Sequence, residues 1–136
     1  MRRLIFAAAL AAGLCLLAAG CGDGKLRTRG RLMKGGQPLL PRENESVRVT
    51  FVPILAGGKP PADHYHAEFN RADATFRSAG KDKKGMPPGK YRVAVEYRRQ
   101  KREVFGGVFD EDHSPFVFDV DSGTPEIVID LDRPPK

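Results

Sequence analysis

Cys21 is the residue whose position most clearly implies a chemical fate. It follows Gly20 at the end of an apolar segment, residues 4–19, and Arg2 and Arg3 stand in front of that segment. A positive start, a short apolar run and small residues before the cut are the parts of a secretory signal. The sequence therefore predicts export and cleavage between Gly20 and Cys21, which leaves a cysteine at the new N-terminus.

Residues 18–21, Ala-Ala-Gly-Cys, resemble a bacterial lipobox, in which the thiol takes a diacylglycerol before the signal is cut. Ala18 departs from the commoner Leu, but Leu17 keeps the site apolar. The alternatives are ordinary secretion or an uncleaved membrane anchor, although the apolar stretch of 16 residues is shorter than the roughly 20 that a spanning helix needs. The resemblance implies a palmitate-bearing lipoprotein, held in a membrane of the bacterial cell envelope and facing the periplasm or the exterior.

Metal binding is the sharpest alternative chemistry, and its candidates are His64, His66 and Glu68. A spacing of two puts the three side chains on one face of a strand. Imidazole and carboxylate groups are proper zinc ligands, and His113 is a candidate for the fourth position. The same spacing also fits the solvated face of a half-buried strand, which we take as the main interpretation, with no metal or other cofactor.

An acidic segment, Asp110-Glu111-Asp112, raises the question of calcium. Counting from Asp110, Pro115 stands where an EF-hand loop requires glycine, and Asp121 stands where it requires glutamate. The segment is therefore predicted to be a hydrated loop, with a calcium site of another type as the alternative.

A basic cluster falls in a predicted hairpin turn and consists of Arg98, Arg99, Lys101 and Arg102. The main interpretation is a solvated turn that pairs with acidic residues, and the alternative is a contact with anionic lipid or acidic polysaccharide. Residues 22–109 hold 19 Lys and Arg against 9 Asp and Glu, whereas residues 110–136 hold 2 against 8. The two parts should attract one another, and export argues against nucleic acid as a partner.

Catalytic nucleophiles are sparse after the signal. The four serines are Ser46, Ser78, Ser114 and Ser122, and none lies in a Gly-x-Ser-x-Gly elbow. Cys15 leaves with the signal and Cys21 is acylated, so no thiol remains for catalysis or for a disulfide. The sequence therefore predicts a protein that is not an enzyme.

Alternation with a period of two recurs throughout the exported part and predicts strands. It is clearest in residues 45–53 and 90–98, where valine and aromatic side chains share one face. Further strands are predicted in residues 25–32, 64–70, 74–77, 104–109, 116–120 and 127–131. We expect an all-β fold, a single antiparallel β-sandwich of seven to nine strands in residues 25–132, behind a signal helix (1–20) and a lipidated tether (21–24), with a tail in 133–136.

Four segments resemble the small planctomycete-type lipoproteins with a carboxypeptidase regulatory-like, or transthyretin-like, domain. These segments are Gly36-Gln37-Pro38, Val49-Thr50-Phe51-Val52-Pro53, residues 73–76 and residues 87–93. Two departures are Thr75, where a turn glycine is usual, and Gln37, where lysine is common. The resemblance implies a prealbumin-like or Ig-like sandwich that carries no chemistry of its own, and it implies that Tyr91, in Pro-Pro-Gly-x-Tyr, is a core residue.

The main functional hypothesis is a lipid-anchored envelope module with a non-enzymatic binding or structural role. Its partners would be the membrane, through the N-terminal lipid, and an envelope protein or polysaccharide. One alternative is a metal-binding envelope protein that uses His64, His66 and Glu68. The other is an accessory domain that docks on a separate enzyme.

Overall fold

Nine β-strands form the regular structure of residues 24–136, the part of the chain that this computed structural model describes. Gly20 and Cys21 lie outside the described residues. The strands are β1 (Arg29–Lys34), β2 (Gln37–Pro38), β3 (Glu45–Pro53), β4 (Tyr65–Asn70), β5 (Thr75–Ser78), β6 (Gly89–Arg99), β7 (Arg102–Glu103), β8 (Val117–Val120) and β9 (Ile127–Asp130). One short 3-10 turn, η1 (Ala56–Gly58), lies between β3 and β4.

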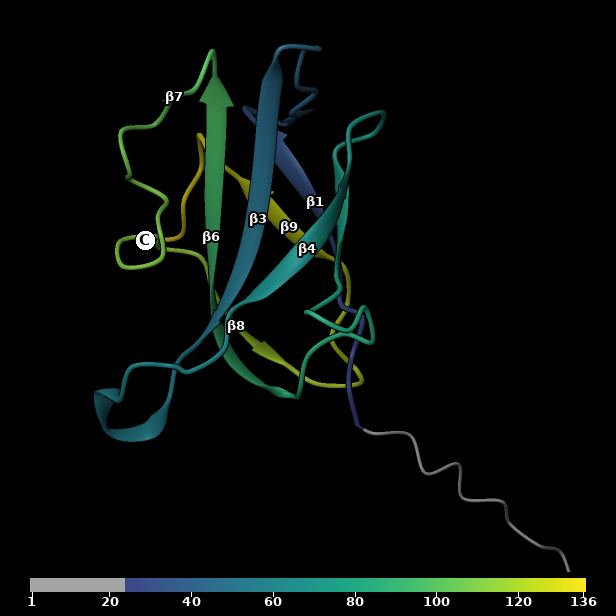
Figure 1. Cartoon of the computed structure of the whole chain (residues 1–136), viewed down its shortest axis with the longest axis vertical. Coiled ribbons are helices and arrows are strands. Elements are labelled where there is room, and N and C mark those ends of the chain that lie inside the picture. Colours follow the sequence, from purple (N-terminus) through teal and green to yellow (C-terminus); the bar gives the residue numbers. More distant parts are fainter. Residues whose placement is uncertain (1–23) are drawn as a thin grey trace, which may run out of the picture.

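The strands form one sheet that curls over on itself. β3 pairs with β6 along its whole length, and β6 also pairs with β7 and β8. β4 pairs with β3 through its first residues and with β5 through its last ones, so it is the corner at which the sheet turns. β5 pairs with β1, which also pairs with β2 and β9, and Figure 1 shows β1 and β9 lying behind β3 and β6. The all-β, sandwich-like class is confirmed, although the pair β1–β9 is parallel.

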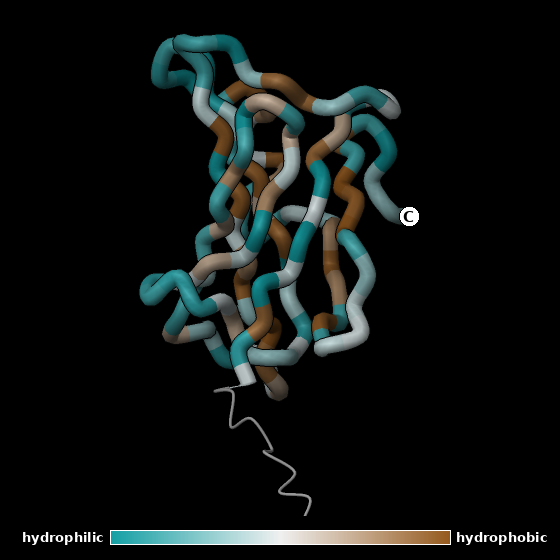
Figure 2. Tube along the Cα trace, turned by 90° about the vertical axis from the view of Figure 1, so that its right-hand side faces the viewer, coloured by the Kyte–Doolittle hydropathy of each residue, from teal (hydrophilic) through white to brown (hydrophobic). Residues whose placement is uncertain are grey.

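Alternating side chains fill the space between the two layers. Tyr91, Val93, Val95 and Tyr97 of β6 face inward, and each is at most 6% exposed. The ring of Phe51 on β3 lies 6.1 Å from the ring of Phe76 on β5, centre to centre, and so joins the layers. Figure 2 shows hydrophobic stretches along the strands, and most of the turns at their ends are hydrophilic. The faces predicted from the alternation of β3 and β6 are therefore confirmed.

The predicted strand in residues 104–109 is wrong, because β7 ends at Glu103 and turns follow it. Gly106 and Gly107 adopt φ angles of 63° and 82°, which extended strands exclude. The aromatic spacing has another cause: the rings of Phe105 and Phe109 stack edge to face at 5.2 Å over the edge of the core. The segment 104–116 is therefore an ordered loop, called the edge loop below, that runs beside β6.

The expected attraction between the basic body and the acidic C-terminal segment is present in ion pairs. Lys34 of β1 lies 2.9 Å from Asp132, and Arg31 lies 3.4 Å from Glu126. The parallel pairing of β1 with β9 brings these charges together across about a hundred residues of sequence. The pairs are exposed, so each contributes little to stability, about 0–1 kcal/mol.

Candidate functional site

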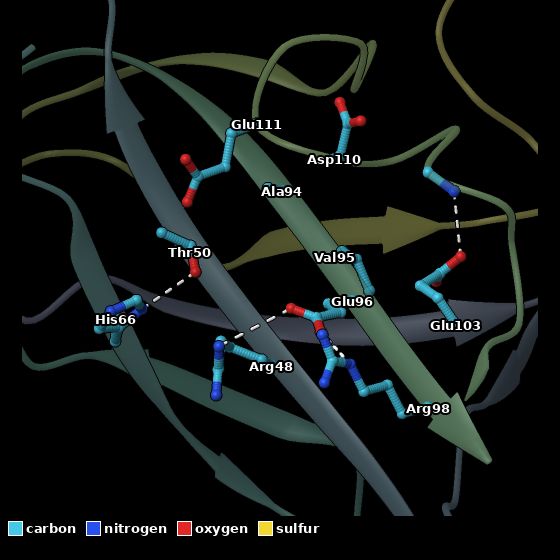
Figure 3. A pocket seen from close by; sticks show the side chains of 11 residues that line it. Arg48, Thr50, His66, Ala94, Val95, Glu96, Arg98, Glu103, Asp110 and Glu111 are labelled. Atoms are coloured by element: carbon cyan, nitrogen blue, oxygen red, sulfur yellow. Dashed lines mark hydrogen bonds and ion pairs between the residues drawn. The ribbon is translucent and has the colours of Figure 1, made fainter. Parts of the chain in front are cut away.

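A polar groove crosses the outer face of the sheet where β3, β4 and β6 lie side by side (Figure 3). The register sets Arg48 of β3 opposite Glu96 of β6, and it sets Thr50 of β3 between His66 and Ala94. Because these residues alternate with core residues, their side chains all point away from the core. The groove has a volume of about 250 Å³, and the edge loop forms its far wall.

One end of the groove carries charges that pair with one another. Glu96 lies between two guanidinium groups: Arg48 is 3.8 Å away, and Arg98 contacts the other carboxylate oxygen. The Arg48 side chain is 66% exposed and the Glu96 side chain 30% exposed. Ion pairs this open to solvent exchange readily with a ligand's own charges. This end therefore offers two cations and one anion to a polar ligand.

The other end of the groove holds hydroxyl, imidazole and carboxylate groups. The Thr50 hydroxyl lies 3.1 Å from Nδ1 of His66, and Glu111 lies 3.0 Å from Nδ1 of His64. Figure 3 shows the Glu111 carboxylate extending from the edge loop over the side of Thr50. The groove thus has hydrogen-bond donors and acceptors at both ends above a buried floor of Ala94.

Backbone and side-chain hydrogen bonds hold the edge loop in place. The amide of Val95 donates to the carbonyl of Phe109, and the guanidinium of Arg92 donates to the carbonyl of Asp112, at 2.8 Å and 2.9 Å. Asp110 accepts from the backbone amide and the imidazole of His113, and these bonds hold the pKa of its carboxyl below the usual range. The segment predicted as a hydrated acidic loop therefore supplies the ordered wall of the groove.

The three metal candidates do not converge. His66 and Glu68 share the exposed face of β4, as predicted, and His64 precedes the strand. Their partners differ, since His66 contacts Thr50, His64 contacts Glu111, and Glu68 pairs with Arg27 at 2.9 Å. Across residues 24–136 no three His, Cys, Asp or Glu side chains are close enough to hold one ion. The metal alternative therefore receives no support from the geometry.

Two of the four serines have a structural role. The Ser78 hydroxyl donates to the carbonyl of Leu26 at 3.1 Å, and the Ser114 hydroxyl donates to the carbonyl of Val93 at 2.6 Å. Both side chains are buried, at 0% and 2% exposure. These hydroxyls fasten loops to strands, so neither is presented to a substrate.

The predicted basic cluster lies in the β6–β7 hairpin, where Gln100 and Lys101 form the turn with φ angles of 49° and 67°. Two of its four cations are already engaged: Arg98 pairs with Glu96, and Arg99 donates to Glu45 at 2.6 Å. Lys101 and Arg102 are the exposed members that form no ion pair within the described residues. Among the residues described, the hairpin therefore leaves only Lys101 and Arg102 unpaired, fewer cations for an anionic surface than its composition predicts.

Glu45 is a buried ionisable residue that the sequence patterns did not reveal. It begins β3 and is only 4% exposed, yet its carboxylate accepts hydrogen bonds from the Tyr97 hydroxyl, from Arg99 and from the Arg42 amide. The backbone bond from Arg42 and the bond from Tyr97 lower the pKa of Glu45 to about 2. Its role is structural, because the network ties the loop before β3 to the end of β6. Only the cross-strand pairing of Glu45 with Arg99 could have identified it, and that pairing is known only once the register of β3 on β6 is known.

Among residues 24–136, no helix is long and apolar enough to cross a bilayer. The predicted lipidation site lies upstream of this part. No protein-family model, curated protein or solved structure matches the chain. The resemblance to carboxypeptidase regulatory-like lipoproteins therefore stays a prediction, and the function has to be argued from the residues themselves.

Proposed function

We propose that this protein is a lipid-anchored module of the bacterial cell envelope that binds a polar partner and catalyses no reaction. The observation that carries the binding role is the groove on the outer face of β3, β4 and β6. At one end Arg48, Glu96 and Arg98 pair with one another and stay partly exposed, and at the other end Glu111 extends from the edge loop, an arrangement that suits recognition of a ligand that carries both donors and acceptors.

The anchor follows from the lipobox and from its distance to the fold. Three residues separate Cys21 from Lys25, whose neighbour Leu26 already bridges to Met86. An extended chain advances at most about 3.6 Å per residue, so the sandwich begins within roughly 18 Å of the acylated cysteine. Acyl chains contribute about 0.8 kcal/mol per buried methylene, and several of them would hold the protein on the membrane almost permanently.

The anchor is tested by metabolic labelling with an alkyne fatty acid in bacteria that express the full chain. The wild type and Cys15→Ser should both be labelled and should both sediment with membranes. Cys21→Ser should lose the label and leave the membrane fraction. Unchanged labelling of Cys21→Ser would overturn the anchor assignment.

The groove is tested with soluble polysaccharides and peptidoglycan fragments, the polar polymers of an envelope. Binding by the full-length protein should weaken in Arg48→Ala and in Glu111→Gln, because each removes one wall of polar contacts. Asp112→Asn is the matched control, since its exposed carboxylate neighbours Glu111 and does not line the groove. Equal binding by all three variants would contradict this choice of site. If neither the wild type nor any variant binds, the choice of ligand class is contradicted.

A further inference from the structure

An apolar projection lies at the end of the sandwich where the described chain begins. Ile54 and Leu55 follow β3 and are 38% and 43% exposed, although both are large aliphatic residues. With Pro61 and with Pro87 and Pro88 of the opposite loop, they border a depression of about 310 Å³. These residues, together with the η1 turn that follows Leu55, are called the apolar tip below. Exposed aliphatics gathered at one end of a small domain mark a contact surface.

Two lysines that pair with no carboxylate of the described chain flank the apolar tip, Lys59 directly after η1 and Lys90 on the rim of the depression. On this end of the molecule Lys81 pairs with Asp63, and Lys25 contacts Asp82. Four further exposed lysines form no ion pair with any carboxylate in residues 24–136: Lys59, Lys83, Lys84 and Lys90. An apolar patch with lysines beside it is a surface that an anionic bilayer recognises, with aliphatics at the acyl boundary and ammonium groups among the phosphates.

Hydrogen bonds place the tip and the start of the described chain at the same end of the sandwich. Leu26 pairs with Met86, and four residues later the carbonyl of Lys90 accepts a 2.8 Å bond from the amide of Ile54. Figure 1 shows the loop with η1 and the beginning of the coloured chain at the same end of the sandwich. If Cys21 is acylated, its short tether keeps this end at the bilayer surface, so the tip cannot lie far from lipid.

We propose that the apolar tip rests in the head-group layer of an anionic membrane and fixes the orientation of the sandwich. This inference depends on the proposed lipid anchor, and it adds the face that the protein turns toward the membrane. The acyl chains supply the attachment to the membrane, so the tip contributes to the orientation of the sandwich more than to its membrane affinity. β6 has 11 residues, and at about 3.3 Å per residue it carries the basic hairpin roughly 36 Å from the tip. The hairpin and the neighbouring end of the groove then face outward from the bilayer.

The chain contains no tryptophan, which allows a single reporter to be placed at will. Full-length acylated Leu55→Trp is reconstituted into phosphatidylethanolamine–phosphatidylglycerol vesicles whose acyl chains are brominated and quench tryptophan on contact. Leu40→Trp is the matched control, because Leu40 is 54% exposed and precedes β3 at the opposite end. Quenching of Leu55→Trp should exceed that of Leu40→Trp several-fold, with emission at shorter wavelength. Ile54→Trp supplies a second reporter at the tip.

Charge is tested in the Leu55→Trp background. The pair Lys59→Glu and Lys90→Glu should reduce the quenching, whereas Lys101→Glu with Arg102→Glu, the same charge change in the distant hairpin, should leave it unchanged. Equal quenching of Leu55→Trp and Leu40→Trp would overturn the proposal. A shift to shorter wavelength without bromine quenching would also overturn it, because a second copy or another protein would then cover the tip.

The measurements distinguish a wrong orientation of the tip from a wrong assignment of the lipid anchor. Each variant is first labelled with the alkyne fatty acid. A labelled, membrane-bound Leu55→Trp that escapes quenching refutes the orientation alone, whereas loss of the label from the parent chain refutes the anchor on which it rests.

Discussion

The two ends of β6 carry tyrosines whose hydroxyl groups have very different partners. At the far end the Tyr97 hydroxyl donates to the buried carboxylate of Glu45, which Arg99 also contacts. At the tip end the Tyr91 hydroxyl donates to the backbone carbonyl of Pro87 at 2.6 Å. Both rings belong to the core, at 6% and 2% exposure. The same strand is therefore fastened by charge at one end and by a neutral hydrogen bond at the other.

This difference between the two ends of β6 assigns stability to one end and contact with a partner surface to the other. At the far end, a buried carboxylate accepts hydrogen bonds from a hydroxyl, a guanidinium and a backbone amide, so removing Glu45 leaves all three donors without that acceptor. At the tip end, aliphatic residues and lysines stay exposed, and their loss takes nothing from the core. We therefore expect the stability of the protein to depend on Glu45 and its interaction with the membrane to depend on Leu55 and Lys59.

Of the changes at the two ends of β6, Glu45→Ala should have the largest effect. The change leaves the buried Tyr97 hydroxyl and the part-buried Arg42 amide without their acceptor, which is costly, and it removes the ion-pair partner of Arg99, whose side chain is 56% exposed. The thermal midpoint of the full-length protein, followed by circular dichroism, should fall by roughly 10 °C or more. Glu43→Ala, an exposed neighbour, is the control and should leave the midpoint unchanged. A similar midpoint for both variants would remove the distinction between the two ends.

The same carboxylate should make stability depend on acid. Hydrogen bonds lower the pKa of Glu45 from 4.5 to about 2, so the folded state holds its proton less tightly than the unfolded chain does. The stabilisation is therefore fully present above pH 4.5 and is lost as the pH falls toward 2. Urea midpoints measured between pH 6 and pH 2 should show this loss in the wild type and a shallower one in Glu45→Gln. Parallel curves would mean that other carboxyl groups control the acid response.

Much of the fold was predictable because it depends on local alternation. β3 and β6 carry inward valine and aromatic residues at every second position, and Pro87-Pro88-Gly89 marks where β6 begins, so strands, faces and turns followed from neighbours in sequence. Residues 104–109 of the edge loop were predicted as a strand because Phe105 and Phe109 are apolar, but both rings turn inward from a backbone path bent by Gly106 and Gly107.

The groove and the Glu45 network were not predictable because both depend on which residues face each other across strands. Thr50 meets His66 and Arg48 meets Glu96 only in the observed register. Glu111 joins them from a loop whose path is set by its bonds to β6. The predicted His-x-His-x-Glu face was correct as a strand pattern, but the neighbours of β4 gave each side chain a different partner.

A smaller effect should distinguish the two tyrosines. Tyr97→Phe removes a donor from an ionised carboxylate and should reduce the free energy of unfolding by about 1.5 kcal/mol, whereas Tyr91→Phe removes a neutral bond and should cost about 1 kcal/mol. Burial raises the pKa of both tyrosine hydroxyls, and that of Tyr91 rises to about 12. The folded state then keeps a proton that the unfolded chain loses above pH 10, so stability falls between pH 10 and 12, and Tyr91→Phe should lessen that fall. Equal urea midpoints at pH 7 together with unchanged alkaline curves would contradict this assignment.

The smallest effect on stability should come from Leu55→Ser at the tip. Leu55 lies outside the core, and its replacement exposes no buried donor or acceptor, so the free energy of unfolding should change by less than about 0.5 kcal/mol. Leu32→Ala shows what the assay can resolve, because Leu32 is fully buried and its truncation should cost about 3 kcal/mol. If Leu55→Ser destabilised the protein as Leu32→Ala does, the tip would be part of the core. A stable Leu55→Ser variant would show that the fold does not need this side chain, as expected of a residue that contacts a membrane.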